Sequence, residues 1–178
     1  MSLLPTLLER IARARVDLRM GLPVILTTGD TAILAIAIES LTPERLADLR
    51  GLGPVALALT ARRATTLKAR VYDDDLARVE VPIDADLSWL QSLADPADDL
   101  AAPMKGPLTS LRSGEASLPR LALALVKSAR LLPSAAYVDL QDAGSFALKH
   151  DLTLLPRSTA EPLLNQSSPL HPVAAARL

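Results

Sequence analysis

The first twenty residues carry apolar side chains at the spacing of an α-helix. These residues are Leu4, Leu7, Leu8, Ile11, Ala14 and Leu18, and the four nearby arginines lie mostly outside their stripe. Gly21 follows the stripe and Pro23 follows soon after, a combination that stops a helix and begins an extended segment. The pattern therefore predicts a helix that ends before Gly21 and packs one side on the core.

Two apolar runs, 24–26 and 31–38, come next and are separated by a short polar segment. The second run is apolar and β-branched, which favours a largely buried strand. A helix is predicted to start after Thr42, because Thr is a good N-cap and Pro43 suits the first helical position. Gly51 is expected to end this helix.

The chain continues with short strands and helices up to residue 156. The predicted strands are 55–59, 76–83, 136–140 and 152–155, and the predicted helices are 60–68, 87–93, 118–132 and 146–150. The Asp-, Pro- and Ala-rich segment 94–107 is predicted to be a loop. Because strands and helices alternate irregularly, the pattern indicates a mixed, twisted sheet flanked by helices, in the α+β class with three α/β/α layers.

Residues 157–178 differ from the rest of the chain in composition. They are rich in Ser, Pro and Ala, and their apolar residues lose any sustained period. We therefore expect one domain over residues 1–156, followed by a linker or tail over residues 157–178 that packs little of the core.

Composition excludes several classes of site and partner. The chain has no cysteine, which excludes disulfides, thiolate zinc sites and a cysteine nucleophile. Aromatic residues make up 2% and the net charge is −1, so the chain offers neither stacking platforms nor a field for a polyanion, and we expect no nucleic-acid partner. No apolar run reaches the length of a membrane span and the N-terminus lacks a signal-peptide pattern, so we expect a cytoplasmic protein without a membrane partner.

Few polar residues stand out as candidates for chemistry. The acidic runs 73–75 and 98–99 could bind a cation, but exposed acidic turns are usually only solvated. His150 has no identifiable partner nucleophile, so a structural role at a helix end is favoured over that of a general base. The other histidine, His171, lies in the expected tail.

Six stretches in continuous order resemble 3,4-dihydroxy-2-butanone 4-phosphate synthase, the riboflavin-pathway enzyme that acts on ribulose 5-phosphate. They are RARVDLRMGLPVIL, IESLTPERLADLR, GPVALALT, SLADPADDLAAP, LALALVKSARLLPSAAYVDLQDAG and FALKHDL. Together they cover about residues 10–156. The resemblance implies the fold of that synthase.

The resemblance also implies that the magnesium site of active members is lost. In those members a longer acidic loop between the first two strands supplies a metal-binding Glu. Here the matching segment 27–31 is shorter and its carboxylate is Asp30. A lone Asp on a tight turn cannot supply the near-octahedral set of oxygens that Mg²⁺ requires. Asp30 is therefore interpreted as a turn former beside Gly29.

The second metal ligand of active members is a His at the head of the long helix. The matching positions here are 118–121, where Pro119 suits a first helical turn and Leu121 joins the apolar stripe. These residues cannot bind a metal, so we expect no metal site and no cofactor in this chain. Asp139 stands where the family has a catalytic Glu, and without its partners it is interpreted as a carboxylate that caps or pairs locally.

Two functions from different classes remain open. One is a non-catalytic scaffold, dimerisation or regulatory domain. The alternative is an enzyme with altered chemistry on a sugar phosphate such as ribulose 5-phosphate, with Asp139 and Asp30 as its candidate catalytic residues and Arg112 or Arg120 as candidates to bind phosphate. Convergence of the two aspartates and an arginine on one cavity would favour the enzyme. A cavity filled by Leu121 would favour the scaffold.

The resemblance suggests two partners. Degenerate domains of this type resemble the N-terminal part of GTP cyclohydrolase II-type proteins, so a covalently linked cyclohydrolase domain is a candidate partner, and the full-length parent is then expected to be a hydrolase of that type. Zinc is expected only in that separate domain, because this chain has no cysteine to hold it. A homodimer is expected as well, since the family builds its active site at a two-fold interface. This chain alone is expected to be inactive.

Overall fold

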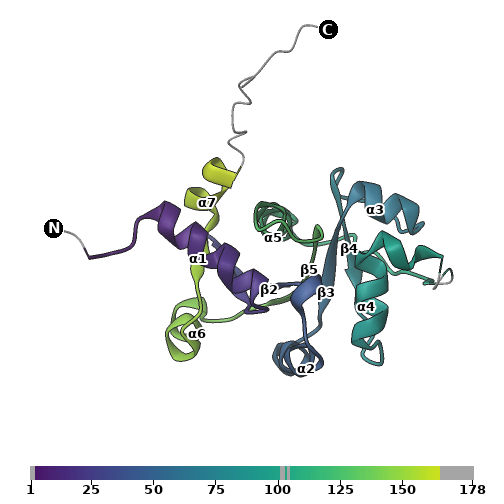
Figure 1. The fold of residues 1–178 in the computed structure, drawn as a ribbon, viewed down its shortest axis with the longest axis horizontal. Helices are drawn as coiled ribbons and strands as arrows, with labels where there is room; N and C mark the ends of the chain where they lie inside the picture. Colours follow the sequence, from purple (N-terminus) through teal and green to yellow (C-terminus); the bar gives the residue numbers. More distant parts are fainter. Residues whose placement is uncertain (1–2, 101–102, 104, 165–178) are drawn as a thin grey trace, which may run out of the picture.

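A computed structural model describes residues 3–100, 103 and 105–164, which form a six-stranded sheet with helices on both faces (Figure 1). In spatial order the strands are β4 (Leu76–Glu80), β3 (Ala56–Thr60), β5 (Ser134–Asp139), β2 (Thr31–Ala37), β1 (Val24–Thr28) and β6 (Leu154–Pro156). The helices are α1 (Leu7–Arg19), α2 (Pro43–Leu52), α3 (Ala61–Thr66), α4 (Leu87–Ala94), α5 (Ser117–Ser128), α6 (Ala143–His150) and α7 (Arg157–Leu164). The β1–β6 pair is parallel and the other pairs of these strands are antiparallel, which confirms the predicted mixed sheet.

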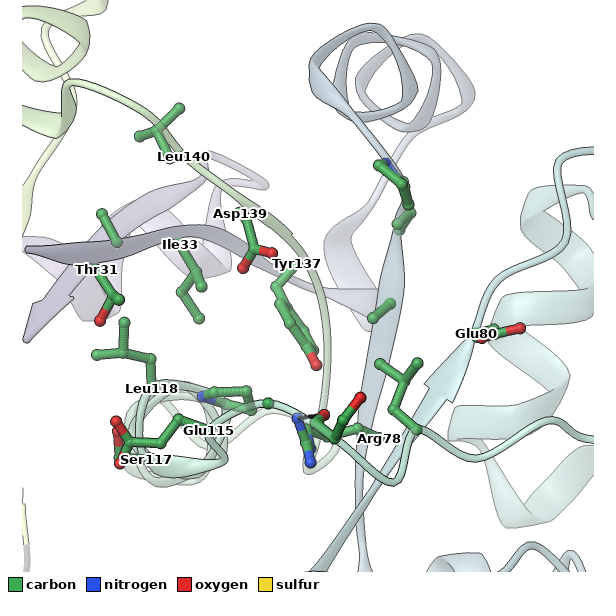
Figure 2. A pocket seen from close by; sticks show the side chains of 18 of the residues that line it. Thr31, Ile33, Arg78, Glu80, Glu115, Ser117, Leu118, Tyr137, Asp139 and Leu140 are labelled. Carbon is green, nitrogen blue, oxygen red and sulfur yellow. Dashed lines mark hydrogen bonds between the residues drawn. The ribbon is translucent and has the colours of Figure 1, made fainter.

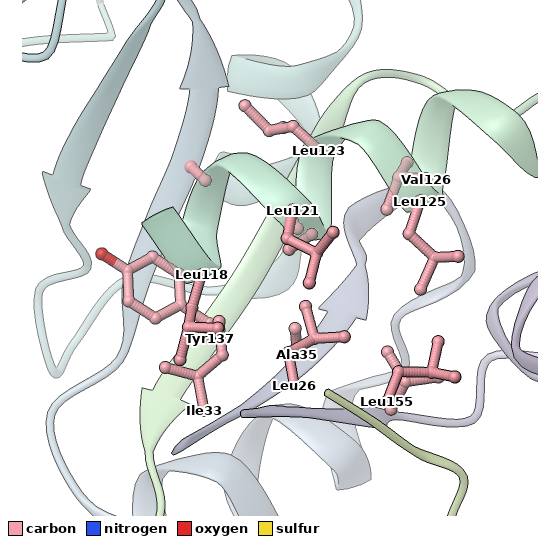
Figure 3. Close-up of a cluster of buried hydrophobic side chains, with 14 of the residues drawn as sticks. Leu26, Ile33, Ala35, Leu118, Leu121, Leu123, Leu125, Val126, Tyr137 and Leu155 are labelled. Atoms are coloured by element: carbon pink, nitrogen blue, oxygen red, sulfur yellow. The ribbon is translucent and has the colours of Figure 1, made fainter. Parts of the chain in front are cut away.

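Apolar side chains of the strands alternate between two cores, one on each face of the sheet. In β2, Ile33 and Ala35 belong to the core that includes residues of α1, α5 and α7, whereas Leu34 and Ile36 belong to the core that includes residues of α2 and α4. This alternation follows from the two-residue period of a strand. Figure 1 shows α5 and α7 on one side of the sheet and α2 and α6 on the other, and Figure 3 shows the leucines of α5 lying over β1 and β2. The three predicted layers are therefore present.

Helices α1 and α2 are both capped by threonine. The Thr6 side chain accepts a hydrogen bond from the Glu9 backbone N–H, and the Glu9 carboxylate accepts one from the Thr6 N–H at 2.7 Å, which completes a capping box for α1. Thr42 accepts from the backbone N–H of Arg45 at 3.4 Å and Pro43 is the first residue of α2, as predicted. No helix among the described residues is both long and apolar enough to cross a membrane.

The strand predicted over residues 76–83 ends earlier, at Glu80. Pro82 explains the difference, because proline has no N–H to donate to a neighbouring strand. Beyond it Ile83 is 87% exposed, although the alternating pattern placed it with the inward-facing residues. The apolar alternation therefore continues for three residues past the end of the strand.

The long helix predicted over residues 118–132 ends at Ser128. Arg130 adopts a left-handed conformation with φ 62°, and its N–H donates to the carbonyl of Lys127 at 3.0 Å. The next N–H, that of Leu131, donates to the carbonyl of Val126 at 3.2 Å. These two bonds form a Schellman motif, which satisfies the last carbonyls and stops the helix.

Residues 157–164, which the sequence placed in a tail, instead form helix α7 and dock on the domain. Ala160 is completely buried, and Leu163 and Leu164 pack against the core on the α5 side of the sheet. α7 contacts α1, α5, β1 and β6. The expected start of the tail is therefore wrong for these residues, because a short helix needs only one apolar side and Pro162 does not prevent it. The rest of the expected tail, residues 165–178, lies outside the described residues.

The docking of α7 predicts that Ala160→Asp lowers stability. A buried, unpaired carboxylate should cost about 3 kcal/mol or more, which corresponds to a fall of roughly 6 °C or more in the melting temperature of a domain of this size. Ser158→Asp, at an exposed position of the same helix, is the matched control and should melt close to the wild type. Thermal unfolding followed by circular dichroism measures both. Equal melting temperatures for the two variants would contradict the docking of α7.

Candidate functional site

A cavity of about 550 Å³ lies at one end of the sheet, on the face covered by α5, and is called here the sheet-end cavity. Its wall comes from the β1–β2 turn, the last residues of β5, the first residue of β3, the end of β4 and the head of α5 (Figure 2). The polar side chains of its wall are those of Asp30, Thr31, Arg78, Glu80, Ser113, Glu115, Ser117, Tyr137, Asp139 and Gln141. Both candidate catalytic aspartates of the sequence analysis are among them.

Asp30 and Asp139 both line the sheet-end cavity. Asp30 lies in the two-residue turn between β1 and β2, where Gly29 has φ 53° and so supplies a backbone conformation that most residues avoid. Asp139 is the last residue of β5 and is paired with Ile33 of β2. Both side chains are exposed, and neither takes part in an ion pair or side-chain hydrogen bond with the described residues. The local pairing expected for Asp139 is therefore wrong, because the strand ends at the cavity and its carboxylate faces open space.

Arg78 is the arginine of this cavity, and the sequence did not single it out. Its side chain is 4% exposed, and its Nε donates to Asp73 at 2.8 Å while its Nη2 donates to the other carboxylate oxygen at 3.2 Å. Its Nη1 donates to the carbonyl of Ser113 at 3.0 Å. A bidentate pair with a half-buried carboxylate neutralises the guanidinium and fixes its orientation. Three of the five guanidinium N–H groups of Arg78 are thus engaged within the chain, and Asp73 balances its charge.

Tyr137 lies beside Arg78 and points from β5 toward the cavity (Figure 2). Burial raises the pKa of its phenol to about 12, and the charge of Arg78 offsets only part of that effect. The Tyr137 hydroxyl therefore stays protonated at neutral pH and can act as a hydrogen-bond donor but not as a base. No sequence motif pointed to this residue, but its position two residues before Asp139 places both side chains on one face of β5.

The charges that line the cavity are mainly negative. Asp30, Glu80, Glu115 and Asp139 supply four carboxylates, against the single positive charge of Arg78 that Asp73 already balances. Such a wall repels a phosphate group, since like charges at close range are unfavourable. Among the described residues, no group of three or more His, Cys, Asp or Glu side chains is arranged to hold a metal ion.

The head of α5 closes the cavity with apolar side chains. Leu118 is 4% exposed, and it lines the wall together with the neighbouring Pro119. Leu121 is buried in the core beneath α5 and does not line the cavity (Figure 3). The two tests set by the sequence both favour the enzyme: two aspartates and an arginine meet at one cavity, and Leu121 does not fill it. Neither test takes into account whether the arginine is already paired with a carboxylate of the chain, as Arg78 is with Asp73.

The two arginines proposed to bind phosphate lie elsewhere. Arg120 makes a bidentate pair with Asp75, at 2.7 to 3.0 Å, and this bond lowers the pKa of that carboxyl. The Arg112 guanidinium lies 5.4 Å from the ring centroid of Tyr72. Neither lines the sheet-end cavity. Two of the three aspartates in the run 73–75 are therefore paired with arginines, which corrects the expectation that this turn is simply solvated.

The second acidic run contains another ion-pair cluster. The Asp99 carboxylate accepts hydrogen bonds from Arg63 at 2.6 and 2.8 Å and from the Lys105 ammonium. Arg63 also donates to the carbonyls of Ser92 and Leu93 at 3.0 and 2.6 Å, and both cations are more than nine-tenths buried. These bonds hold the pKa of Asp99 well below its usual range. Asp99 therefore has a structural role, in place of the solvated state expected for residues 98–99.

His150 has the structural position that the sequence predicted. It is the last residue of α6, and its ring centroid lies 4.3 Å from that of Phe146 one turn earlier. Both rings border a second cavity of about 530 Å³ between α2 and α6, which is lined mainly by apolar residues. His150 therefore lines a different cavity from Asp139. His171 lies outside the described residues.

Comparison with known proteins identifies relatives of both kinds that the resemblance implied. The chain is 32% identical over 180 residues to GTP cyclohydrolase-2 of Azospirillum brasilense, a match that covers 96% of this chain and 46% of that protein. The chain thus spans just under half the length of that relative. No protein-family model matches it.

Solved structures with the same architecture are 3,4-dihydroxy-2-butanone 4-phosphate synthases. The enzyme of Candida albicans has a TM-score of 0.65 at 17% identity, covering 88% of this chain and 97% of that one. RibBX, a two-domain synthase from A. baumannii, has a TM-score of 0.62 at 16% identity, covering 84% of this chain and 56% of that one. A synthase in complex with two magnesium ions has a TM-score of 0.62 at 17% identity, covering 88% and 97%. The chain is therefore a 3,4-dihydroxy-2-butanone 4-phosphate synthase-like domain in its fold, as expected.

The Asp99 cluster predicts a pH-dependent loss of stability. Because the folded pKa of Asp99 lies below the unfolded value, its contribution is complete above about pH 4 and declines as the pH falls toward the folded value. Asp99→Asn should therefore melt below the wild type at pH 7, and the difference should narrow by pH 3. Asp98→Asn, one residue earlier, is the control and should change little. A difference that is constant across this pH range would contradict the assignment.

Proposed function

We propose that this chain is a non-catalytic scaffold and dimerisation domain of a riboflavin-biosynthesis protein of the GTP cyclohydrolase-2 type. The observation that carries the proposal is the state of Arg78 in the sheet-end cavity. Its guanidinium is held by Asp73 and by the Ser113 carbonyl, so the wall offers a phosphorylated sugar four carboxylates and no free cation among its described residues.

A sugar-phosphate enzyme at this position would need two further things. It would need a metal or fixed donors to stabilise a developing enediolate, and it would need groups of suitable pKa to move protons. Asp139 can accept a proton, whereas Tyr137 stays a neutral phenol at physiological pH. The magnesium chemistry of active synthases does not fit this donor set, and no step through a metal follows from it. The cavity thus contains a possible base, Asp139, but no group that would stabilise the negative charge formed when that base removes a proton from the substrate.

The relatives support a larger parent protein. The match to GTP cyclohydrolase-2 extends over 46% of that protein, and RibBX is described as a two-domain synthase. We infer that the domain is joined in the parent protein to a cyclohydrolase domain that holds zinc and opens GTP. Without cysteine this chain could not supply a thiolate zinc site for that reaction. Its own contribution would be to hold two such parents together and position them.

The runner-up function is an enzyme with altered chemistry on a sugar phosphate. The observation that favours it is the meeting of Asp30 and Asp139 in one cavity with Tyr137 between β5 and α5. In that case Asp139 is the base, and Asp30 orients a hydroxyl of the substrate. This function requires Arg78 to leave Asp73 when the phosphate binds, which would leave a half-buried carboxylate unpaired at a cost of about 3 kcal/mol or more.

The proposal predicts that the purified domain releases no formate from ribulose 5-phosphate and Mg²⁺ above a protein-free blank. The loss of a single stabilising group can lower a rate by about 10² or more, and here the metal ligands and the phosphate cation are missing together. Formate is measured by a coupled assay, and Mg²⁺ binding by calorimetry, which should show no saturable heat. Steady formate release that is abolished in Asp139→Asn and kept in Asp48→Asn, a carboxylate of the other cavity, would establish the enzyme instead.

A further inference from the structure

The cavity between α2 and α6, called here the α2–α6 cavity, is nearly as large as the sheet-end cavity and lies on the other face of the sheet, where Figure 1 shows both helices. Its volume is about 530 Å³, and Leu34 and Ile36 of β2 contribute its sheet side. Helix α6 covers this face loosely, since none of its residues, all of which the structure describes, is buried. A concave and largely apolar space of this size is typical of a site for a small molecule.

Two opposite charges border the α2–α6 cavity without neutralising each other. Arg45 and Asp48 lie three residues apart on α2, so their side chains leave the same side of the helix as Leu49 and Leu52, which also line the cavity. Within the part of the chain that the structure describes, neither charged side chain takes part in an ion pair or a hydrogen bond. A guanidinium, which only donates hydrogen bonds, and a carboxylate, which only accepts them, are therefore both available at the edge of an apolar space.

The opposite wall of the cavity, on α6, is aromatic. Phe146 and His150 lie one turn apart, and their ring centroids are separated by 4.3 Å with an angle of 36° between the ring planes. Aromatic rings favour another aromatic group over an aliphatic one, because such pairs contribute attraction beyond the area that they bury. The α6 wall therefore suits a flat, conjugated ligand.

We propose that the α2–α6 cavity binds a planar nitrogen heterocycle whose edge carries a ring N–H next to a carbonyl group, as guanine and flavins do. The ring lies over the aliphatic side chains of β2 and beside Phe146. Its N–H donates to the Asp48 carboxylate, and its carbonyl accepts from the Arg45 guanidinium. Residues three apart on a helix have Cβ atoms about 5 to 6 Å apart, so both side chains can reach one edge of one ring.

The charges of the wall disfavour other classes of small ligand. A single strongly charged group, such as a phosphate or an ammonium ion, is attracted by one of Arg45 and Asp48 and repelled by the other. A purely apolar ligand would cover both charges without offering them hydrogen bonds, which is costly. A neutral heterocycle with a donor and an acceptor on the same edge satisfies both side chains. The cavity therefore selects the ring of such a molecule and not a phosphate group attached to it.

This inference goes beyond the proposed function, since a scaffold domain needs no small ligand of its own. The α2–α6 cavity and the sheet-end cavity share no lining residue among those described, and they lie on opposite faces of the sheet. The two proposals can therefore fail separately. Formate release would overturn the non-catalytic role without affecting this site, and an empty α2–α6 cavity would leave that role intact.

Nuclear magnetic resonance of the methyl-labelled domain tests the site through the signals of Leu34, Ile36 and Leu49. Guanosine and riboflavin, which are uncharged and carry the proposed edge, should shift these signals saturably, with dissociation constants of about 100 μM or below for ligands of this size. The tighter of the two identifies the ring for which the site is built. Adenosine, whose base has neither a ring N–H nor a carbonyl, is the matched control ligand and should bind about tenfold more weakly.

Three results would overturn the proposal. One is the absence of saturable shifts with both guanosine and riboflavin. Another is equal affinity for adenosine, which would show that the cavity does not recognise the edge of the ring. The third is a shift of the same signals when the protein concentration is raised without ligand, which would assign the cavity to a contact between copies of the chain.

Substitutions on α2 test the assigned residues. Asp48→Asn removes the charged acceptor while keeping the side-chain shape, and it should weaken guanosine and riboflavin about tenfold while leaving adenosine unchanged. Glu44→Gln, an exposed carboxylate of the same helix outside the cavity, is the matched control and should bind as the wild type does. Equal affinities of these two variants contradict the role of Asp48.

A third variant tests the cavity without removing a polar group. Ala47 lines the α2–α6 cavity from an exposed position of α2, so Ala47→Phe should fill the space and still fold. Its melting temperature should stay close to that of the wild type, and it should lose saturable binding of guanosine and riboflavin. Unchanged binding by the folded variant would place the ligand elsewhere and overturn the site.

Discussion

A sheet that is buried on both faces leaves polar side chains almost no place except the ends of its strands. In β2 and β5 successive residues enter two different apolar cores, so every interior position is alanine, valine, isoleucine, leucine or tyrosine apart from Ser134 at the start of β5. Carboxylates therefore collect where β2 begins and β5 ends. The sheet-end cavity, its acidic wall and the helices that cover both faces all follow from this constraint.

Arg78 is an exception to this placement of polar side chains at the ends of strands. It occupies a strand interior on the α5 side, and a charge that is 4% exposed must be paired to be tolerated. Asp73, from the turn just before β4, meets this need and balances the charge of the arginine. A similar arrangement recurs where Asp99 pairs with both Arg63 and Lys105. In both places an acid that looked free in the sequence is used to make a buried cation possible.

The sequence predicted most of the architecture because most of it depends on local patterns. Caps such as Thr42 and the period of apolar residues are encoded within a few positions of where they act. The expected stop at Gly51 was wrong by two residues, because α2 continues to Leu52 and has Gly53 as its C-cap. The errors arise where a distant contact decides. Nothing near Ala160 announces that α7 will dock on α5, and nothing near Asp73 or Asp75 names the arginines at positions 78 and 120 that pair with them. For the cavity, the sequence identified Asp30 and Asp139 but could not identify Tyr137 or the state of Arg78, since burial and pairing exist only after folding.

The account depends most on the claim that Arg78 is unavailable to a phosphorylated ligand. Nuclear magnetic resonance titration of the labelled domain with ribulose 5-phosphate, without metal, examines this directly at Arg78, Gly114 and Asp139, residues that surround the guanidinium and the cavity. We predict no saturable change in their resonances at millimolar ligand, and an Arg78 side-chain signal that stays that of an arginine paired with a carboxylate. Saturable shifts centred on these residues, together with a change in the Arg78 side-chain signal, would contradict the account.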